Sequence, residues 1–186
     1  DFLMAPWSAP GLREVITSSL GAMDAVGAPT TWVLSNHDVV RHPSRLGLPA
    51  DAPWPHGIGA SDPQPDEELG LRRARAAALL MLALPGSAYL YQGEELGLPE
   101  HTALDDAERQ DPVWPRSGFT ERGRDGCRVP LPWAAAEPGL GFSPTGLTWL
   151  TQPASFAGYA LDAQQGVPGS TFELYRGALR LRKEFR

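Results

Sequence analysis

Two short apolar runs, each ending abruptly in polar residues, constrain the fold of this chain more than any other feature. Thr30–Leu34 is rich in β-branched and aromatic residues and stops at Ser35. Ala88–Tyr91 is a second such run and stops at Gln92. Apolar runs without polar alternation are typical of strands buried on both faces of a parallel sheet. We therefore expect two buried strands whose carboxyl ends carry polar side chains.

Helical patterns lie on both sides of the first strand. Ser8 and Pro10 form a helix start, and the apolar residues that follow recur every three or four positions: Leu12, Val15, Ile16, Leu20 and Met23. Before this helix, Phe2–Ala5 is a candidate for another short strand. A second helix is predicted from about Asp66 to Leu84, stopped by Pro85 and Gly86. We place three arginines on its outer face: Arg72, Arg73 and Arg75.

The last third of the chain contains two further helical signals. Pro153–Gln164 is compatible with a short helix. Ser170 and Glu173 have the spacing of a capping box, which predicts a helix start. Four residues of that helix would share one face: Leu174, Ala178, Leu181 and Phe185.

Two segments have many Pro and Gly residues and little periodicity, at about residues 43–65 and 97–150. Loops of this length in a compact domain usually carry function. Strands that alternate with helices predict consecutive βα units of an α/β fold, in either a barrel or a doubly wound sheet.

Composition excludes several classes of protein. The chain has 186 residues, 42% of them hydrophobic, and a net charge of −6, with its basic residues scattered. A protein with this charge and no cluster of basic residues lacks the positive surface that binds the phosphate backbone of nucleic acid. The longest apolar run, Ala76–Leu84, is far shorter than the roughly twenty residues that span a bilayer. We expect a soluble, cytoplasmic protein without a nucleic-acid or membrane partner. The single cysteine, Cys127, is interpreted as a packed side chain, and we predict no metal and no cofactor.

Polar pairs follow both predicted strands. His37 and Asp38 stand where catalytic groups gather in barrels and open α/β sheets, although residues there also form turns and caps. Glu94 and Glu95 have the same ambiguity, and adjacent side chains diverge. We expect at most one of the two glutamates to face a site and the other to be solvated or to cap a turn.

Four segments together resemble the α-amylase superfamily, glycoside hydrolase family 13, in its α-glucosidase and oligo-1,6-glucosidase branch. They run in the family's order, and they are DFLMAPW, TTWVLSNHDVVRHPSRLG, LLMLALPGSAYLYQGEELGLPE and GRDGCRVPLPW. The resemblance covers essentially the whole of residues 1–186. It implies the C-terminal part of a (β/α)₈ (TIM) barrel, from about strand 6 to helix 8.

The resemblance also implies roles for four residues. Asp38 would be the third carboxylate of the site, which holds sugar hydroxyls and favours an oxocarbenium-like ring. His37 would donate to hydroxyls of the same sugar, and Asn36 belongs to the same substrate-binding motif. Arg124 matches an arginine that closes the blind end of the sugar pocket, usually paired with an aspartate on an early strand. The implied substrate is a disaccharide or short oligosaccharide.

A retaining glycosidase also needs a nucleophilic carboxylate and an acid/base carboxyl about 5 Å apart. In this family they lie on strands four and five, so the resemblance implies that both lie upstream of this chain. The chain has neither an initiator methionine nor a helix stop at its end, so we expect an excerpt that is inactive by itself. Two alternatives stay open. Transglycosylating or isomerising relatives share these motifs, and some relatives are non-catalytic subunits, although these commonly lose site residues that are present here.

Overall fold

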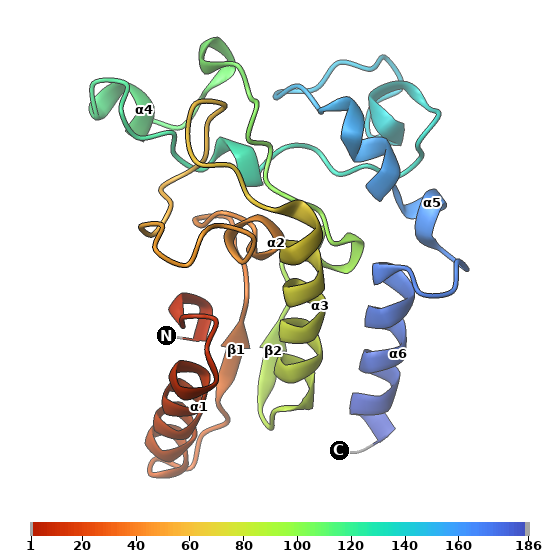
Figure 1. The fold of residues 1–186 in the computed structure, drawn as a ribbon. Coiled ribbons are helices and arrows are strands. Elements are labelled where there is room, and N and C mark those ends of the chain that lie inside the picture. The colour runs from red at the N-terminus through yellow and green to blue at the C-terminus, as the bar shows by residue number, and fades with distance from the viewer. Residues whose placement is uncertain (1, 185–186) are drawn as a thin grey trace.

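The computed structural model describes residues 2–184 and contains a central pair of strands with helices around it (Figure 1). The strands are β1 (Thr31–Val33) and β2 (Ser87–Tyr89). The α-helices are α1 (Ala9–Asp24), α2 (His42–Arg45), α3 (Glu67–Ala83), α4 (Val113–Arg116), α5 (Leu161–Gln164) and α6 (Thr171–Glu184). Six 3-10 helices complete the order: η1 (Phe2–Met4), η2 (Glu94–Leu96), η3 (Asp106–Glu108), η4 (Asp125–Cys127), η5 (Pro138–Gly141) and η6 (Ala154–Tyr159).

The strands β1 and β2 are parallel neighbours, and α3 connects them as a βαβ crossover. Trp32 pairs in register with Ala88, and both pack into the core with side chains of α3. The Trp32 ring is fully buried, stacks edge-on against Phe2 and donates from Nε1 to the Pro85 carbonyl at 2.6 Å. The α/β prediction and the parallel pairing are therefore confirmed for this part of the chain.

The predicted helix starts at Ser8 and Asp66 are correct. The Ser8 hydroxyl accepts the Gly11 N–H, and the Asp66 carboxylate accepts the Leu69 N–H at 2.9 Å, so each caps the first turn of its helix. Gly70 of α3 lies against α2, where an added Cβ would meet the Pro43 carbonyl oxygen at 2.0 Å. The small side chain at this position allows α3 to pack closely under the loop that follows β1.

Two predictions about the strands are wrong. Phe2–Ala5 is not a strand: residues Phe2–Met4 form η1, which directs the Phe2 ring onto Trp32. The Leu3 carbonyl accepts from the Arg45 guanidinium at 2.9 Å, so this segment satisfies its backbone without a neighbouring strand. The strands are also not buried on both faces, because Thr31 is exposed and Tyr89 is 64% exposed. Only the sheet face that carries Trp32 and Ala88 is covered by the core.

The arginines of α3 are not all on its outer face. Arg72 is exposed and pairs with Glu68. Arg73, however, donates to the Leu46 carbonyl at 2.8 Å, and Arg75 donates to the Thr171 hydroxyl at 3.0 Å. Long side chains can follow a surface and reach buried acceptors at its rim, which apolar periodicity does not reveal.

The capping box is half formed at α6. The Ser170 hydroxyl accepts the Glu173 N–H at 3.2 Å, but the Glu173 carboxylate accepts the Gly166 N–H instead of returning to Ser170. Leu174 and Ala178 pack against the core, while Leu181 is 47% exposed. Phe185, predicted on the same face, lies outside the described residues. The segment 153–164 forms η6 and α5 rather than one helix.

Long irregular segments gather beyond the carboxyl ends of the two strands, at the top of Figure 1. They contain only short helices, and a second apolar cluster holds the segment after β2 together: Leu96, Leu98, Leu104, Val129, Leu131, Leu150 and Phe156. Within residues 2–184, no helix is long and apolar enough to cross a membrane.

Candidate active site

The turn that follows β1 presents His37 and Asp38 to solvent. The Asn36 side-chain oxygen accepts the Asp38 N–H at 2.8 Å, which closes an Asx turn. The exposed fractions of the His37 and Asp38 side chains are 69% and 48%. Asn36, proposed from the sequence as substrate-binding, therefore has a structural function here: it shapes the turn that holds Asp38.

Arg124, far along the chain in the loop after β2, points at this turn. Its Nη1 donates to Asp38 Oδ1 at 2.8 Å. Arg128 adds a contact to the same oxygen at 3.3 Å, and His37 Nε2 lies 3.3 Å from Asp38 Oδ2. The hydrogen bond from Arg124 is the largest of the effects that hold the pKa of Asp38 below its usual range, so this group remains a carboxylate at neutral pH.

Asp111 fixes Arg124 from the other side. Its buried carboxylate accepts from Arg124 Nε at 2.5 Å, from Nη2 at 3.1 Å and from the Arg124 backbone N–H at 2.9 Å. This bidentate pairing lowers the pKa of Asp111 strongly and raises that of Arg124. Asp125 supports the arrangement because its Oδ2 accepts the Gln110 and Asp111 N–H groups. Arg124 therefore has a local carboxylate partner within this chain that the sequence did not indicate.

A buried arginine joins the three segments that form the site. Arg41 Nη1 donates to the Gln92 carbonyl, and its Nη2 donates to the Cys127 carbonyl, both at 2.9 Å. Its backbone N–H donates to Glu100 Oε2 at 2.9 Å. Burial raises the pKa of Glu100 to about 7 although Arg41 lies beside it. Arg41 therefore links the turn after β1, the end of β2 and the loop that carries Arg124.

Cys127 is packed in this junction, as the sequence indicated. It is fully buried, and burial raises the pKa of its thiol to about 12. The described residues contain no group of three or more His, Cys, Asp or Glu side chains placed to hold a metal ion.

Asp38 and Arg124 line one cavity, which we call the Asp38 cavity. Its volume is about 290 Å³, and its other lining residues are Val40, Trp54, Pro55, His56, Gly57, Val113, Glu121 and Gly123. His37 touches Asp38 but does not line the cavity. The structure thus brings together Asp38 and Arg124 as expected, with His37 at their edge. Trp54 and Glu121 also line this cavity. The sequence contained no signal for either residue, because both lie in segments without periodicity.

The two glutamates after β2 have different environments, and neither lines the Asp38 cavity. Glu94 is buried beside the Tyr175 hydroxyl, and burial raises the pKa of its carboxyl to about 8. Glu95 Oε2 accepts the Gly93 N–H at 2.9 Å within a turn. Glu95 has the capping role expected for one member of the pair, whereas Glu94 belongs to the protein interior.

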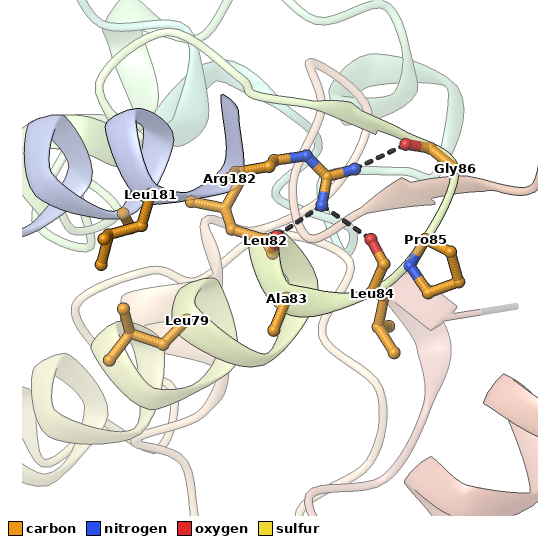
Figure 2. A pocket seen from close by; sticks show the side chains of 9 residues that line it. Leu79, Leu82, Ala83, Leu84, Pro85, Gly86, Leu181 and Arg182 are labelled. Carbon is orange, nitrogen blue, oxygen red and sulfur yellow. Dashed lines mark hydrogen bonds between the residues drawn. The ribbon is translucent and has the colours of Figure 1, made fainter. Parts of the chain in front are cut away.

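A larger groove of about 590 Å³ lies at the opposite end of the molecule, between α3 and α6 (Figure 2). Leucine and alanine side chains dominate its lining, and Arg182 crosses it to bond with the carbonyls of Leu82, Leu84 and Gly86. Among the described residues, no carboxyl or imidazole lines this groove.

The sequence of this chain is similar to those of known proteins over most of its length. Residues 1–186 match the family described as the alpha-amylase catalytic domain. A probable alpha-glucosidase of Rhizobium meliloti (strain 1021) is 38% identical over 152 residues, which is 82% of this chain and 24% of the relative. An oligo-1,6-glucosidase of Parageobacillus thermoglucosidasius is 25% identical, covering 96% of this chain and 31% of the relative.

Solved structures show the same similarity in three dimensions. The alpha-glucosyl transfer enzyme XgtA aligns with a TM-score of 0.72 and 33% identity, covering 98% of this chain and 30% of that one. Bacillus licheniformis trehalose-6-phosphate hydrolase aligns with a TM-score of 0.74 at 23% identity, over 99% of this chain and 35% of that one, which shows a shared fold. This chain therefore spans about a quarter to a third of the length of these relatives.

Proposed function

Because the chain belongs to the alpha-amylase catalytic-domain family, we propose that it forms part of the active site of a retaining α-glucosidase that hydrolyses short α-linked gluco-oligosaccharides. The observation that carries this proposal is the Asp38 carboxylate, which is ionised, half-exposed and aimed with Arg124 into one cavity at the carboxyl ends of the strands. Catalytic groups of α/β barrels occupy this end. We assign the chain to the part of the barrel that runs from about strand 6 to helix 8, in which the described residues form the two strands β1 and β2.

In this proposal Asp38 stabilises the transition state. Glycoside cleavage builds positive charge at the anomeric carbon, and hydrogen bonds to the sugar hydroxyls strengthen as it develops. A fixed carboxylate that accepts from hydroxyls and lies near that charge therefore lowers the barrier more than it tightens substrate binding. Arg124 and Arg128 keep Asp38 ionised, and His37 donates to a hydroxyl of the same sugar.

The nucleophile and the acid/base come from sequence outside these 186 residues. The family resemblance supports this part of the proposal, because it implies that the two carboxyl groups needed for retaining hydrolysis, about 5 Å apart, lie on strands four and five. Asp111, the carboxylate that binds Arg124, is itself buried, so it is unsuited to attack a sugar.

Transfer of the glucosyl unit to another sugar is the second candidate. It is favoured by the 33% identity to an alpha-glucosyl transfer enzyme over nearly the whole chain. Hydrolysis and transfer share the first chemical step and differ in whether water or a sugar hydroxyl completes the second. Product analysis at high sugar concentration separates them, because only transfer yields oligosaccharides longer than the substrate. A purely binding subunit is disfavoured by the presence of His37, Asp38 and Arg124 in one constellation.

The test is steady-state kinetics of Asp38→Asn in the longer enzyme that carries this chain, with an aryl α-glucoside and maltose as substrates. Removal of one preorganised electrostatic group costs about 10²–10³ in rate, so kcat should fall by at least that factor, with a much smaller change in KM. Circular dichroism of both proteins controls for folding. A variant with the parental kcat and only a raised KM would show that Asp38 stabilises the bound substrate and the transition state equally. The proposal would then fail.

A further inference from the structure

The short helix η4 (Asp125–Cys127) lies between the two arginines that bind Asp38. Arg124 directly precedes η4, and Arg128 directly follows it. Their guanidinium groups reach the same oxygen of Asp38, Oδ1, at 2.8 Å and 3.3 Å. Because both side chains start from the ends of one helical turn, a shift of that turn would move both positive charges relative to the Asp38 carboxylate.

The Cys127 carbonyl holds this turn in place. It accepts from Arg41 Nη2 at 2.9 Å and from the Tyr91 hydroxyl at 3.0 Å. The Cys127 side chain is fully buried, so the turn is anchored from the protein interior. Neither Arg41 nor Tyr91 lines the Asp38 cavity, so neither is placed to touch a sugar bound there.

Arg41 is itself fixed on several sides. Its side chain is buried, and its guanidinium lies 4.8 Å from the centre of the Tyr91 ring. Its Nη1 donates to the Gln92 carbonyl, and its backbone N–H donates to the buried Glu100 carboxyl, both at 2.9 Å. A Cβ at Gly93 would lie 2.9 Å from Arg41 Nη1, so the backbone after β2 passes directly against the guanidinium. These contacts hold the guanidinium in one position between the end of β2 and η4.

The two carbonyls that Arg41 joins require the geometry of an arginine. They belong to Gln92 and Cys127, in segments that are far apart in the sequence. A guanidinium has five N–H donors in a rigid planar fork, so one side chain binds both carbonyls and sets the distance between them. A lysine ammonium is a single charged point on a flexible stem and does not set such a distance.

We propose that Arg41 is a positioning residue for the reaction: through the Cys127 carbonyl it sets the place of η4, and with it the two arginine charges that face Asp38. It acts through Arg124 and Arg128 and not by contact with the substrate. This inference rests on the function proposed above and adds a buried residue, outside the cavity, on which the rate depends. The affected groups stabilise the transition state, so the effect should appear in kcat more than in KM.

The first experiment measures steady-state kinetics of Arg41→Lys in the longer enzyme with an aryl α-glucoside. This variant keeps the charge and loses the fork. We expect kcat to fall by about 10- to 100-fold, the scale of small displacements at a site, with KM within about threefold of the parent. Arg182→Lys is the matched control, because Arg182 also binds backbone carbonyls of a neighbouring segment, but at the opposite end of the molecule (Figure 2). Both variants should melt at a lower temperature, and only Arg41→Lys should lose kcat.

A double-mutant cycle tests whether Arg41 acts through Asp38. Addition of Arg41→Lys to Asp38→Asn should lower kcat by less than about threefold, because the carboxylate that the two arginines bind is already absent. Tyr91→Phe is a milder variant that removes only the second donor to the Cys127 carbonyl. It should lower kcat by about threefold to tenfold, the scale of one hydrogen bond, and it provides the test if Arg41→Lys does not fold.

Three results would overturn this inference. The first is the parental kcat in Arg41→Lys, or in Tyr91→Phe where Arg41→Lys does not fold. The second is a loss of kcat from Arg41→Lys that is as large in the Asp38→Asn background as in the parent. The third is an equal loss of kcat in Arg182→Lys, which would show a general effect of lower stability. The proposed function fails on a different measurement, the parental kcat in Asp38→Asn alone.

Discussion

The Asp111 carboxylate binds two nitrogens of the Arg124 guanidinium, Nε at 2.5 Å and Nη2 at 3.1 Å, and leaves Nη1 to contact Asp38 at 2.8 Å. Arg124 is therefore not a mobile surface side chain, although 40% of it is exposed. A planar fork held on one edge presents its remaining nitrogen in one direction. Asp111 sets that direction, and with it the position of the positive charge beside Asp38.

Asp111→Asn in the longer enzyme should lower kcat/KM by about 10- to 100-fold, because an amide cannot hold the arginine bidentately and small displacements at a site cost up to about 10²-fold. Steady-state kinetics with an aryl α-glucoside measures this. Asp111→Glu keeps the charge, so partial recovery of activity would support a positioning role. Asp24→Asn, which changes an exposed aspartate at the C-terminal end of α1, is the control. Parental activity in Asp111→Asn would show that Arg124 needs no such support.

His37→Ala should reduce kcat by about tenfold, less than Asp38→Asn. His37 lies at the edge of the pair and outside the cavity lining, and a donor to a hydroxyl supplies less transition-state stabilisation than a carboxylate near a developing cation. The comparison is made on one substrate with both variants in parallel. A loss in His37→Ala equal to or greater than that in Asp38→Asn would reverse this order of roles.

Gly126→Ala should destabilise the protein by about 1–3 kcal/mol, the usual effect of overpacking. A Cβ there would lie 2.5 Å from the buried Glu100 Oε1 and 2.9 Å from the His101 carbonyl oxygen. Gly21→Ala is the matched control with the opposite sign: nothing lies within 4 Å of its Cβ position on α1, and alanine in a helix interior is better than glycine by about 0.5–1 kcal/mol. Thermal unfolding of both variants provides the measurement. Equal melting temperatures would contradict the close packing at Gly126.

Ionisation of the buried Glu100 carboxyl should lower the free energy of unfolding as the pH rises. Burial raises its pKa from the usual 4.5 to about 7 in the folded protein, so between these values the folded state binds more protons than the unfolded state. The free energy of unfolding then decreases with increasing pH across that window. Glu100→Gln, which keeps an acceptor for the Arg41 N–H, should remove this contribution. Melting temperatures from pH 4.5 to 7.5 measure it, and parallel curves for variant and parent would rule it out.

The 186-residue chain alone should show no turnover of maltose, isomaltose or an aryl α-glucoside, because the proposed function places the nucleophile and the acid/base outside these residues. The assay uses purified chain with Asp38→Asn as the paired sample. Activity that is present in the parent chain and lost in the variant would show that the reacting carboxyl groups are within these residues.

Local chemistry predicted much of the fold. The caps at Ser8 and Asp66 act within one helical turn, and the periodicity of α1 and α3 reports faces that the core then covers. The strand predictions were correct in position to within two residues but wrong about burial, because burial depends on what covers each face. Arg73 and Arg75 were misplaced for a related reason: their acceptors, on Leu46 and Thr171, lie far away in the sequence.

For the candidate site, the sequence by itself determined that His37 and Asp38 follow a strand, and its motifs marked Arg124 as their companion. Only the tertiary structure decided that Asp111 holds Arg124, that Arg41 joins three segments, and that Trp54 and Glu121 line the Asp38 cavity. Strand ends and helix caps are set by neighbours a few residues away, which a sequence displays directly. Ion pairs and cavity linings between aperiodic loops depend on how segments that are far apart in the sequence pack together. No pattern of neighbouring residues encodes that packing.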